Sequence, residues 1–203
     1  ANGTSGDINN IPWRDGDTNK YQPAEKMKKV ANRVATEVAQ AVPGVKLYDW
    51  LPLAAVQQEV SLGVRKPDAA ALARAKEILA KSPNQFPRLK GLDEIYARET
   101  VQMADYPGHV ELILQAMRLG DLAITAVPCE VFVEIGLELK AKNPFPASFT
   151  ISLANGYNGY LPTPAHHALG GYETWRARSS YLEATASPKI TTVLFELLGQ
   201  LKK

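Results

Sequence analysis

Apolar residues recur along this chain with two different spacings, which predict helices and strands. Steps of three and four residues, the period of an amphipathic helix, predict helices at residues 20–42, 67–81, 92–104, 130–142 and 190–201. In the first of these helices the apolar residues of one face are Met27, Val30, Val34, Val38 and Ala41, and charged residues take the other face. Helices that bury one face need a second layer to bury it against, so the pattern predicts a layered domain.

Shorter apolar stretches predict the strands of that second layer. They lie at residues 45–53, 56–64, 109–119, 122–127 and 148–154. The third and fourth should form a hairpin, because Val110, Leu112 and Leu114 alternate with other side chains up to a turn at Gly120. Because the hairpin is antiparallel while other strands alternate with helices, we expect an α/β or α+β fold with a mixed sheet flanked by helices.

Composition narrows the classes of protein to consider. A chain of 203 residues with 45% hydrophobic and 22% charged residues fits one packed domain over residues 1–203. The net charge of +2 and the lack of basic runs with interleaved aromatics argue against a nucleic-acid partner. No apolar stretch approaches the roughly 18 residues that span a bilayer, so no transmembrane segment is expected.

Two short segments place oxygen donors where a hydrophobic strand ends. They are Pro128-Cys129-Glu130-Val131 and Tyr157-Asn158-Gly159-Tyr160-Leu161-Pro162-Thr163. Zinc accepts carboxylate and phenolate oxygens, so Glu130 and Tyr160 could meet at one ion. Taken alone, Glu130 is more typical of a carboxylate at a helix N-terminus, and the alternative for Tyr160 is an aromatic side chain that fills a loop end.

Together with Gly6-Asp7-Ile8-Asn9-Asn10, these segments resemble the neutral/alkaline (non-lysosomal) ceramidase family. The resemblance implies a zinc-dependent hydrolase of a ceramide-like lipid amide, with Glu130 and Tyr160 as zinc ligands. It also implies a further tyrosine at the reaction centre, a role for which Tyr172 and Tyr181 compete. The chain would be the C-terminal half of a larger catalytic domain. An upstream half would then supply two histidine ligands, and the location would be secreted or periplasmic, as in many relatives.

One residue departs from the family pattern. The nucleophilic serine of the family falls on Asn9, and an amide side chain cannot act as an alkoxide-type nucleophile. A metal-activated water could attack instead, and the substrate could then be a different amide or an ester. The other alternative is a domain without catalytic activity that serves in binding or assembly. If the domain is catalytic, Asp7 or Asn9 orients substrate or water. The purely structural interpretation is that both belong to a turn in which their side chains bond to their own backbone.

The only adjacent histidines, His166 and His167, are expected at the start of a short helix. Neighbouring helical residues point about 100° apart, so these two should not hold one ion. We expect surface or substrate-rim histidines, with a general acid as the alternative. Glu134 and Glu138 are expected on a solvated helix face.

Overall fold

The structure is a computed structural model that describes residues 1–9, 21–84 and 89–202. The chain divides into two compact units, one of Ala1–Ile8 with Pro52–Lys203 and one of Asn9–Leu51. The larger unit contains the sheet and most of the predicted site residues. A single-domain organisation of residues 1–203 stays a prediction.

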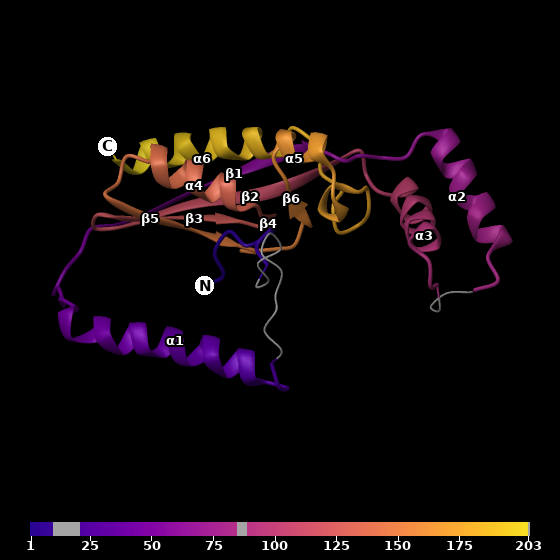
Figure 1. The fold of residues 1–203 in the computed structure, drawn as a ribbon. Helices are drawn as coiled ribbons and strands as arrows, with labels where there is room; N and C mark the ends of the chain where they lie inside the picture. The colour runs from indigo at the N-terminus through magenta and orange to yellow at the C-terminus, as the bar shows by residue number, and fades with distance from the viewer. Residues whose placement is uncertain (10–20, 85–88, 203) are drawn as a thin grey trace. The chain divides into compact units, whose positions relative to one another are not determined.

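A mixed sheet forms the centre of the larger unit (Figure 1). Its strands, in spatial order, are β1 (Leu53–Gly63), β2 (His109–Leu119), β3 (Leu122–Val127) and β5 (Ala147–Ser152). The first three are antiparallel neighbours, whereas β5 runs parallel to β3. The predicted hairpin is therefore β2–β3, and the predicted class, an α/β fold with a mixed sheet, is confirmed.

Helices α4 (Val133–Lys142) and α6 (Ala186–Lys202) lie on one face of this sheet (Figure 1). The core between them and the sheet includes Leu112 and Leu114 of β2 and Leu194 and Leu198 of α6, all at most 1% exposed. Burying each such side chain contributes roughly 1.5–3 kcal/mol. The one cysteine of the chain, Cys129, is fully buried in the same core.

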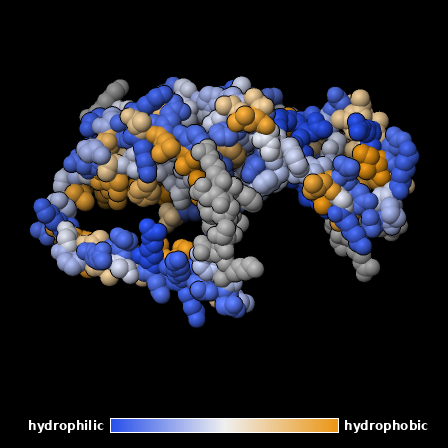
Figure 2. Space-filling view, in the orientation of Figure 1, coloured by the Kyte–Doolittle hydropathy of each residue, from blue (hydrophilic) through white to orange (hydrophobic). Residues whose placement is uncertain are grey.

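The opposite face of the sheet is less covered. In β2 the residues between the buried ones point away from the helices. Among the side chains on this face, Ile113 of β2 is 39% exposed and Phe149 of β5 is 38% exposed. Figure 2 shows hydrophobic residues at the surface where the sheet lies below α4 and α6. The alternation predicted for residues 109–119 is confirmed, because a strand covered on one side buries every second residue.

A helical pair connects β1 to β2. It consists of α2 (Ala69–Lys81) and α3 (Leu92–Ala104), which pack on each other (Figure 1). Asp68 caps α2 by accepting a hydrogen bond from the Ala71 amide at 2.7 Å. Both helices confirm their predictions. Within the described ranges no helix is both long and apolar enough to cross a membrane.

The smaller unit contains α1 (Glu25–Ala41) and a 3-10 turn, η1 (Val42–Gly44). The helix was predicted, although Lys20, its predicted start, lies outside the described residues. Its predicted start is wrong, because residues 21–24 are not helical and the helix begins at Glu25. Within the helix Met27, Val30 and Val34 are three or four residues apart, so they share one face, as the pattern predicted.

The predicted strand at residues 45–53 is also wrong. Residues 45–52 form no strand, and β1 begins at Leu53, opposite Leu119, the last residue of β2. A strand needs a partner for its backbone groups, and the partner of β1 ends at that point.

Candidate functional site

Two very short strands bring the predicted oxygen donors side by side. β4 (Glu130–Val131) and β6 (Tyr160–Leu161) pair in parallel, with Glu130 opposite Tyr160. The Glu130 amide donates to the Gly159 carbonyl at 2.9 Å. Because successive strand residues point to opposite faces, the buried Val131 and Leu161 leave Glu130 and Tyr160 on the other, half-buried face.

The helix predicted at residues 130–142 begins later than expected. Glu130 lies in β4, and α4 starts at Val133. The interpretation of Glu130 as a carboxylate at this helix N-terminus is therefore wrong. That role belongs to Asp7, whose Oδ1 accepts a hydrogen bond from the Val133 amide at 2.8 Å.

The N-terminal segment lies directly against β4. The Gly6 amide donates to the Val131 carbonyl at 2.8 Å, and a Cβ on Gly6 would lie 2.4 Å from the Glu130 carbonyl oxygen. Asp7 bonds to α4, so the expectation that its side chain closes a turn on its own backbone is wrong. Asn9 belongs to the smaller unit, and its place at the pocket stays a prediction; Asn10 lies outside the described residues.

Two tyrosines, Tyr157 and Tyr160, lie next to Glu130. The Tyr157 hydroxyl donates to Glu130 Oε1 at 3.1 Å. Burial, a hydrogen bond with Tyr172 and the charge of Glu130 raise the pKa of Tyr160 above its usual value. Among the residues that the structure describes, no lysine, arginine or histidine forms an ion pair with Glu130. Within the described residues the carboxylate thus accepts a hydrogen bond from one phenol and has no cationic partner.

The structure separates the two competing tyrosines. Tyr172, at the start of η2 (Tyr172–Thr174), is 55% exposed and meets the Tyr160 ring edge-on, with centroids 5.9 Å apart. Tyr181 is 7% exposed, and its hydroxyl donates to Asn158 Oδ1 at 2.6 Å. Burial raises the pKa of Tyr181 to about 12. Tyr172 therefore lies beside Tyr160, whereas Tyr181 is part of the core.

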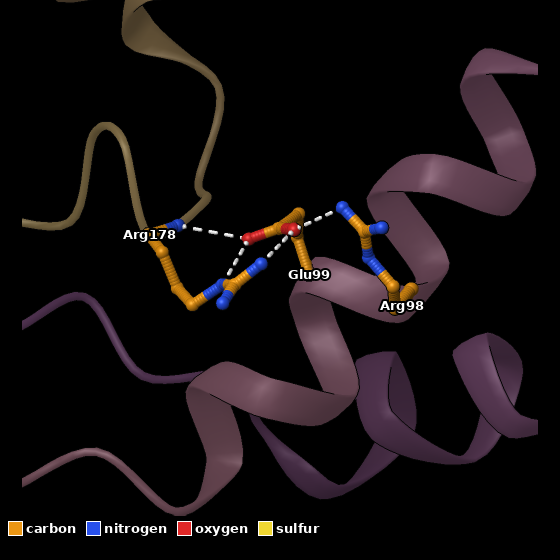
Figure 3. Close-up of polar contacts among 3 residues, drawn as sticks. All are labelled: Arg98, Glu99 and Arg178. Atoms are coloured by element: carbon orange, nitrogen blue, oxygen red, sulfur yellow. Dashed lines mark hydrogen bonds and ion pairs between the residues drawn. The ribbon is translucent and has the colours of Figure 1, made fainter. Parts of the chain in front are cut away.

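The segment that contains these tyrosines is fastened at two points. Arg65 donates to the carbonyls of Thr174, Ser180 and Leu182, at 2.7, 2.7 and 2.8 Å. Glu99 of α3 binds the guanidinium of Arg178 through both of its oxygens, at 2.9 and 3.0 Å, and also contacts Arg98 (Figure 3). Burial by itself would raise the pKa of Glu99, but the hydrogen bonds from Arg178 and Arg98 outweigh it and lower the pKa to about 2.

A cavity of about 360 Å³ opens between α3 and this segment. Its wall includes Ile95, Tyr96, Tyr157 and Arg178. Tyr157 therefore links the cavity to Glu130, because it lines the cavity and its hydroxyl donates to Glu130. The volume falls within the range of about 300–1,000 Å³ that is typical of small-molecule sites.

A second group of polar side chains was missed in the sequence. Asp7, Glu134 and His166 place their potential ligand atoms within 4.8 Å of one another. His166 lies on α5 (Pro164–Leu169), a short helix that Thr163 caps by accepting from the His166 amide. Glu134, expected on a solvated face, lies with Oε1 3.7 Å from His166 Nε2. The Thr163 cap before His166 is a signal in the sequence, but nothing there places the helix beside Glu134.

Comparisons with known proteins give structural likeness only. No protein-family model matches this chain, and no curated protein matches it. Several solved structures are similar to it, including the following two. The neutral ceramidase from Pseudomonas aeruginosa has a TM-score of 0.48 and 16% identity, over 74% of this chain and 28% of its own. A ceramidase complexed with C2 has a TM-score of 0.40 and 19% identity, over 47% of this chain and 15% of its own.

Both of these structures are ceramidases. The chain spans less than a third of the length of either.

Proposed function

We propose that this chain contributes the Glu130–Tyr160 edge to a zinc-dependent hydrolase of linear amides, with a ceramide-like lipid amide as the substrate class. One observation carries the proposal: Glu130 and Tyr160, which come from two separate motifs, are paired residues of one parallel strand pair. The motifs around them resemble those of neutral ceramidases, and this supports the choice of reaction.

The donor set fits zinc. A carboxylate and a phenol oxygen are zinc ligands, and Glu130 has no cation of the described chain beside it. Zinc bound there would polarise an amide carbonyl and lower the pKa of a water. Catalytic zinc takes three protein ligands and leaves one position open, so histidines outside this sequence would complete the set, as the resemblance implies.

Each nearby side chain has a role in this proposal. Tyr157 orients the Glu130 carboxylate through its hydroxyl, and Tyr172 lies where its hydroxyl can donate to a charge that develops next to Tyr160. Asp7 fixes the N-terminal segment on α4. Asn9 cannot act as a nucleophile, so water attacks. The cavity beside Tyr157 receives part of the substrate chain.

The test is hydrolysis of N-acylsphingosine and of an ester of the same acyl chain by the full-length protein. Glu130→Gln and Tyr160→Phe should each lower kcat/KM at least about 10–100-fold, because both alter the metal's surroundings. Glu138→Gln is a matched control that leaves this edge intact. Wild-type rates in the first two variants would refute the proposal.

The absence of a serine at Asn9 favours a second candidate, a binding domain without turnover. The same assay separates the two functions. Zinc-loaded protein that binds the lipid amide but cleaves neither amide nor ester would support the binding domain. Replacement of Tyr172 by Phe should lower turnover more than it changes lipid affinity if hydrolysis is correct.

A further inference from the structure

Three segments that are distant in sequence meet at Asp7, Glu134 and His166. Asp7 lies in the N-terminal segment, Glu134 in the first turn of α4 and His166 in α5. Their ligand atoms lie within 4.8 Å of one another. None of the three belongs to the Glu130–Tyr160 strand pair, and the proposed hydrolase uses only Asp7, as a contact to α4, so it does not explain why the three meet.

His166 is held in a defined orientation. Its Nδ1 lies 2.7 Å from the Thr163 hydroxyl, and its ring meets Phe132 edge-on, with centroids 4.9 Å apart. A ring whose Nδ1–H donates to Thr163 presents the lone pair of Nε2 on the other side, which is the side of Glu134. Metal-binding histidines are fixed in this way by a hydrogen bond on the second nitrogen.

Both carboxylates have an oxygen to offer. Asp7 uses Oδ1 to accept from the Val133 amide, and its other oxygen has no hydrogen bond within the described chain. Glu134 is exposed, and in the same part of the chain its one ion-pair partner is His166. Two carboxylates against one imidazole leave the cluster with excess negative charge, which a divalent cation would balance.

We propose that Asp7, Glu134 and His166 form a second metal site, for a divalent ion of the zinc or manganese class. Two ligands of one tetrahedral ion, each at about 2.0–2.2 Å, lie about 3.3–3.6 Å apart, so binding requires ligand atoms up to 4.8 Å apart to approach by as much as about 1 Å. Rotation of the exposed Glu134 side chain contributes to this approach. The imidazole nitrogen favours these ions over magnesium and calcium.

The ion would tie the N-terminal segment to α4 and α5. That segment places Gly6 against the Glu130 carbonyl, so the second site would stabilise the surroundings of the first. In the structure Glu134 Oε1 lies 3.7 Å from His166 Nε2, and the ion would lie between these two atoms.

The test is titration of metal-depleted, tag-free, full-length protein with Zn²⁺ and with Mn²⁺ by calorimetry. Glu134→Gln and His166→Ala should each remove one equivalent of bound metal or lower its affinity more than about tenfold. Loss of a residue that only supports a ligand already lowers metal affinity by about 10–100-fold, so loss of a ligand should cost at least as much. Glu138→Gln, one turn along α4, and His167→Ala, the neighbouring histidine, are matched controls and should bind as wild type. Circular dichroism shows that each variant is folded.

A Glu130→Gln variant separates this site from the proposed hydrolytic one. It should retain the equivalent that Glu134→Gln removes, whether or not the protein hydrolyses amides. Asp7→Asn should weaken the same equivalent while the amide oxygen still caps α4. Wild-type stoichiometry and affinity in both Glu134→Gln and His166→Ala would overturn the second site, as would equal losses in the controls.

Discussion

Two glycines let other segments approach Glu130 and Tyr160 closely. A Cβ on Gly159, whose φ is +73°, would lie 2.4 Å from the Ser179 carbonyl oxygen. A Cβ on Gly6 would lie at the same distance from the Glu130 carbonyl oxygen. Both clashes would be with backbone, which cannot rotate away as a side chain can. The site therefore depends on the lack of a side chain at Gly6 and Gly159 as well as on the side chains of Glu130 and Tyr160.

Gly6→Ala should displace the N-terminal segment from β4. The added methyl group overlaps the Glu130 carbonyl, and overpacking of this kind costs about 1–3 kcal/mol. Hydrogen exchange should show faster exchange of the Val133 amide, which Asp7 protects, together with a lower melting temperature. Gly3→Ala is the matched control, because a Cβ at Gly3 meets nothing within 4 Å. Equal exchange in the two variants would contradict the prediction.

At the scale of elements, long periodic segments were predictable and short ones were not. The spans of α3 and β2 agree with the expected residues 92–104 and 109–119, because each buries a regular stripe against a neighbour. β4 and β6 are two residues each, too short to carry a period, and only their pairing makes them strands. The family motifs singled out Glu130 and Tyr160, yet they could not show which segments touch them.

The first turn of α4 is capped from a distance. Its own N-cap residue, Phe132, has no side-chain oxygen, and the cap comes from Asp7, 126 residues away along the chain. A cap of this kind joins two segments, whereas the Asp68 cap of α2 serves only its own helix. Local sequence signals for helix starts therefore fail at α4 and succeed at α2.

In metal-free buffer, Asp7→Ala should lower the free energy of unfolding by about 0.5–2 kcal/mol, the range for loss of a helix cap. Asp7→Asn should retain most of it, because the amide oxygen can still accept from Val133. Urea unfolding of the three proteins provides the measurement. Asp68→Ala is a comparison for an ordinary cap; an Asp7→Ala protein as stable as wild type would show that this contact contributes nothing.

At the scale of the larger unit, one buried carboxylate joins α3 to the segment that carries Tyr172. The Glu99 side chain is 8% exposed and bonds Arg178 and Arg98 (Figure 3). The cavity beside Tyr157 is lined by residues from both sides of this connection. Loss of the ion pair would therefore affect both stability and the shape of the cavity.

The pH dependence of stability should reveal this connection. The pKa of Glu99 is lowered to about 2 from 4.5, so its contribution is complete above about pH 4.5 and is lost as the pH falls toward about 2. The shift corresponds to at most about 3 kcal/mol, since Arg178 is half-exposed to screening water. Glu99→Gln should be less stable at pH 6, and the difference from wild type should shrink below about pH 4.5.

Thermal unfolding of both proteins at several pH values between about 2 and 6 measures this difference. Glu94, whose pKa is also about 2, is present in both proteins, so its titration cancels. A constant gap between the two curves at all pH values would show that Glu99 stabilises by packing and not by charge.

The buried thiol of Cys129 can report how often the fold opens near Glu130. This thiol is 0% exposed, directly precedes Glu130 and is the chain's one cysteine. A disulfide reagent such as DTNB can reach it only when the core around it opens, so the labelling rate in solution measures how often this part of the fold, next to β4, opens. A ligand that binds across Glu130 and Tyr160 must slow the colour change, without any assumption about what reaction the protein catalyses.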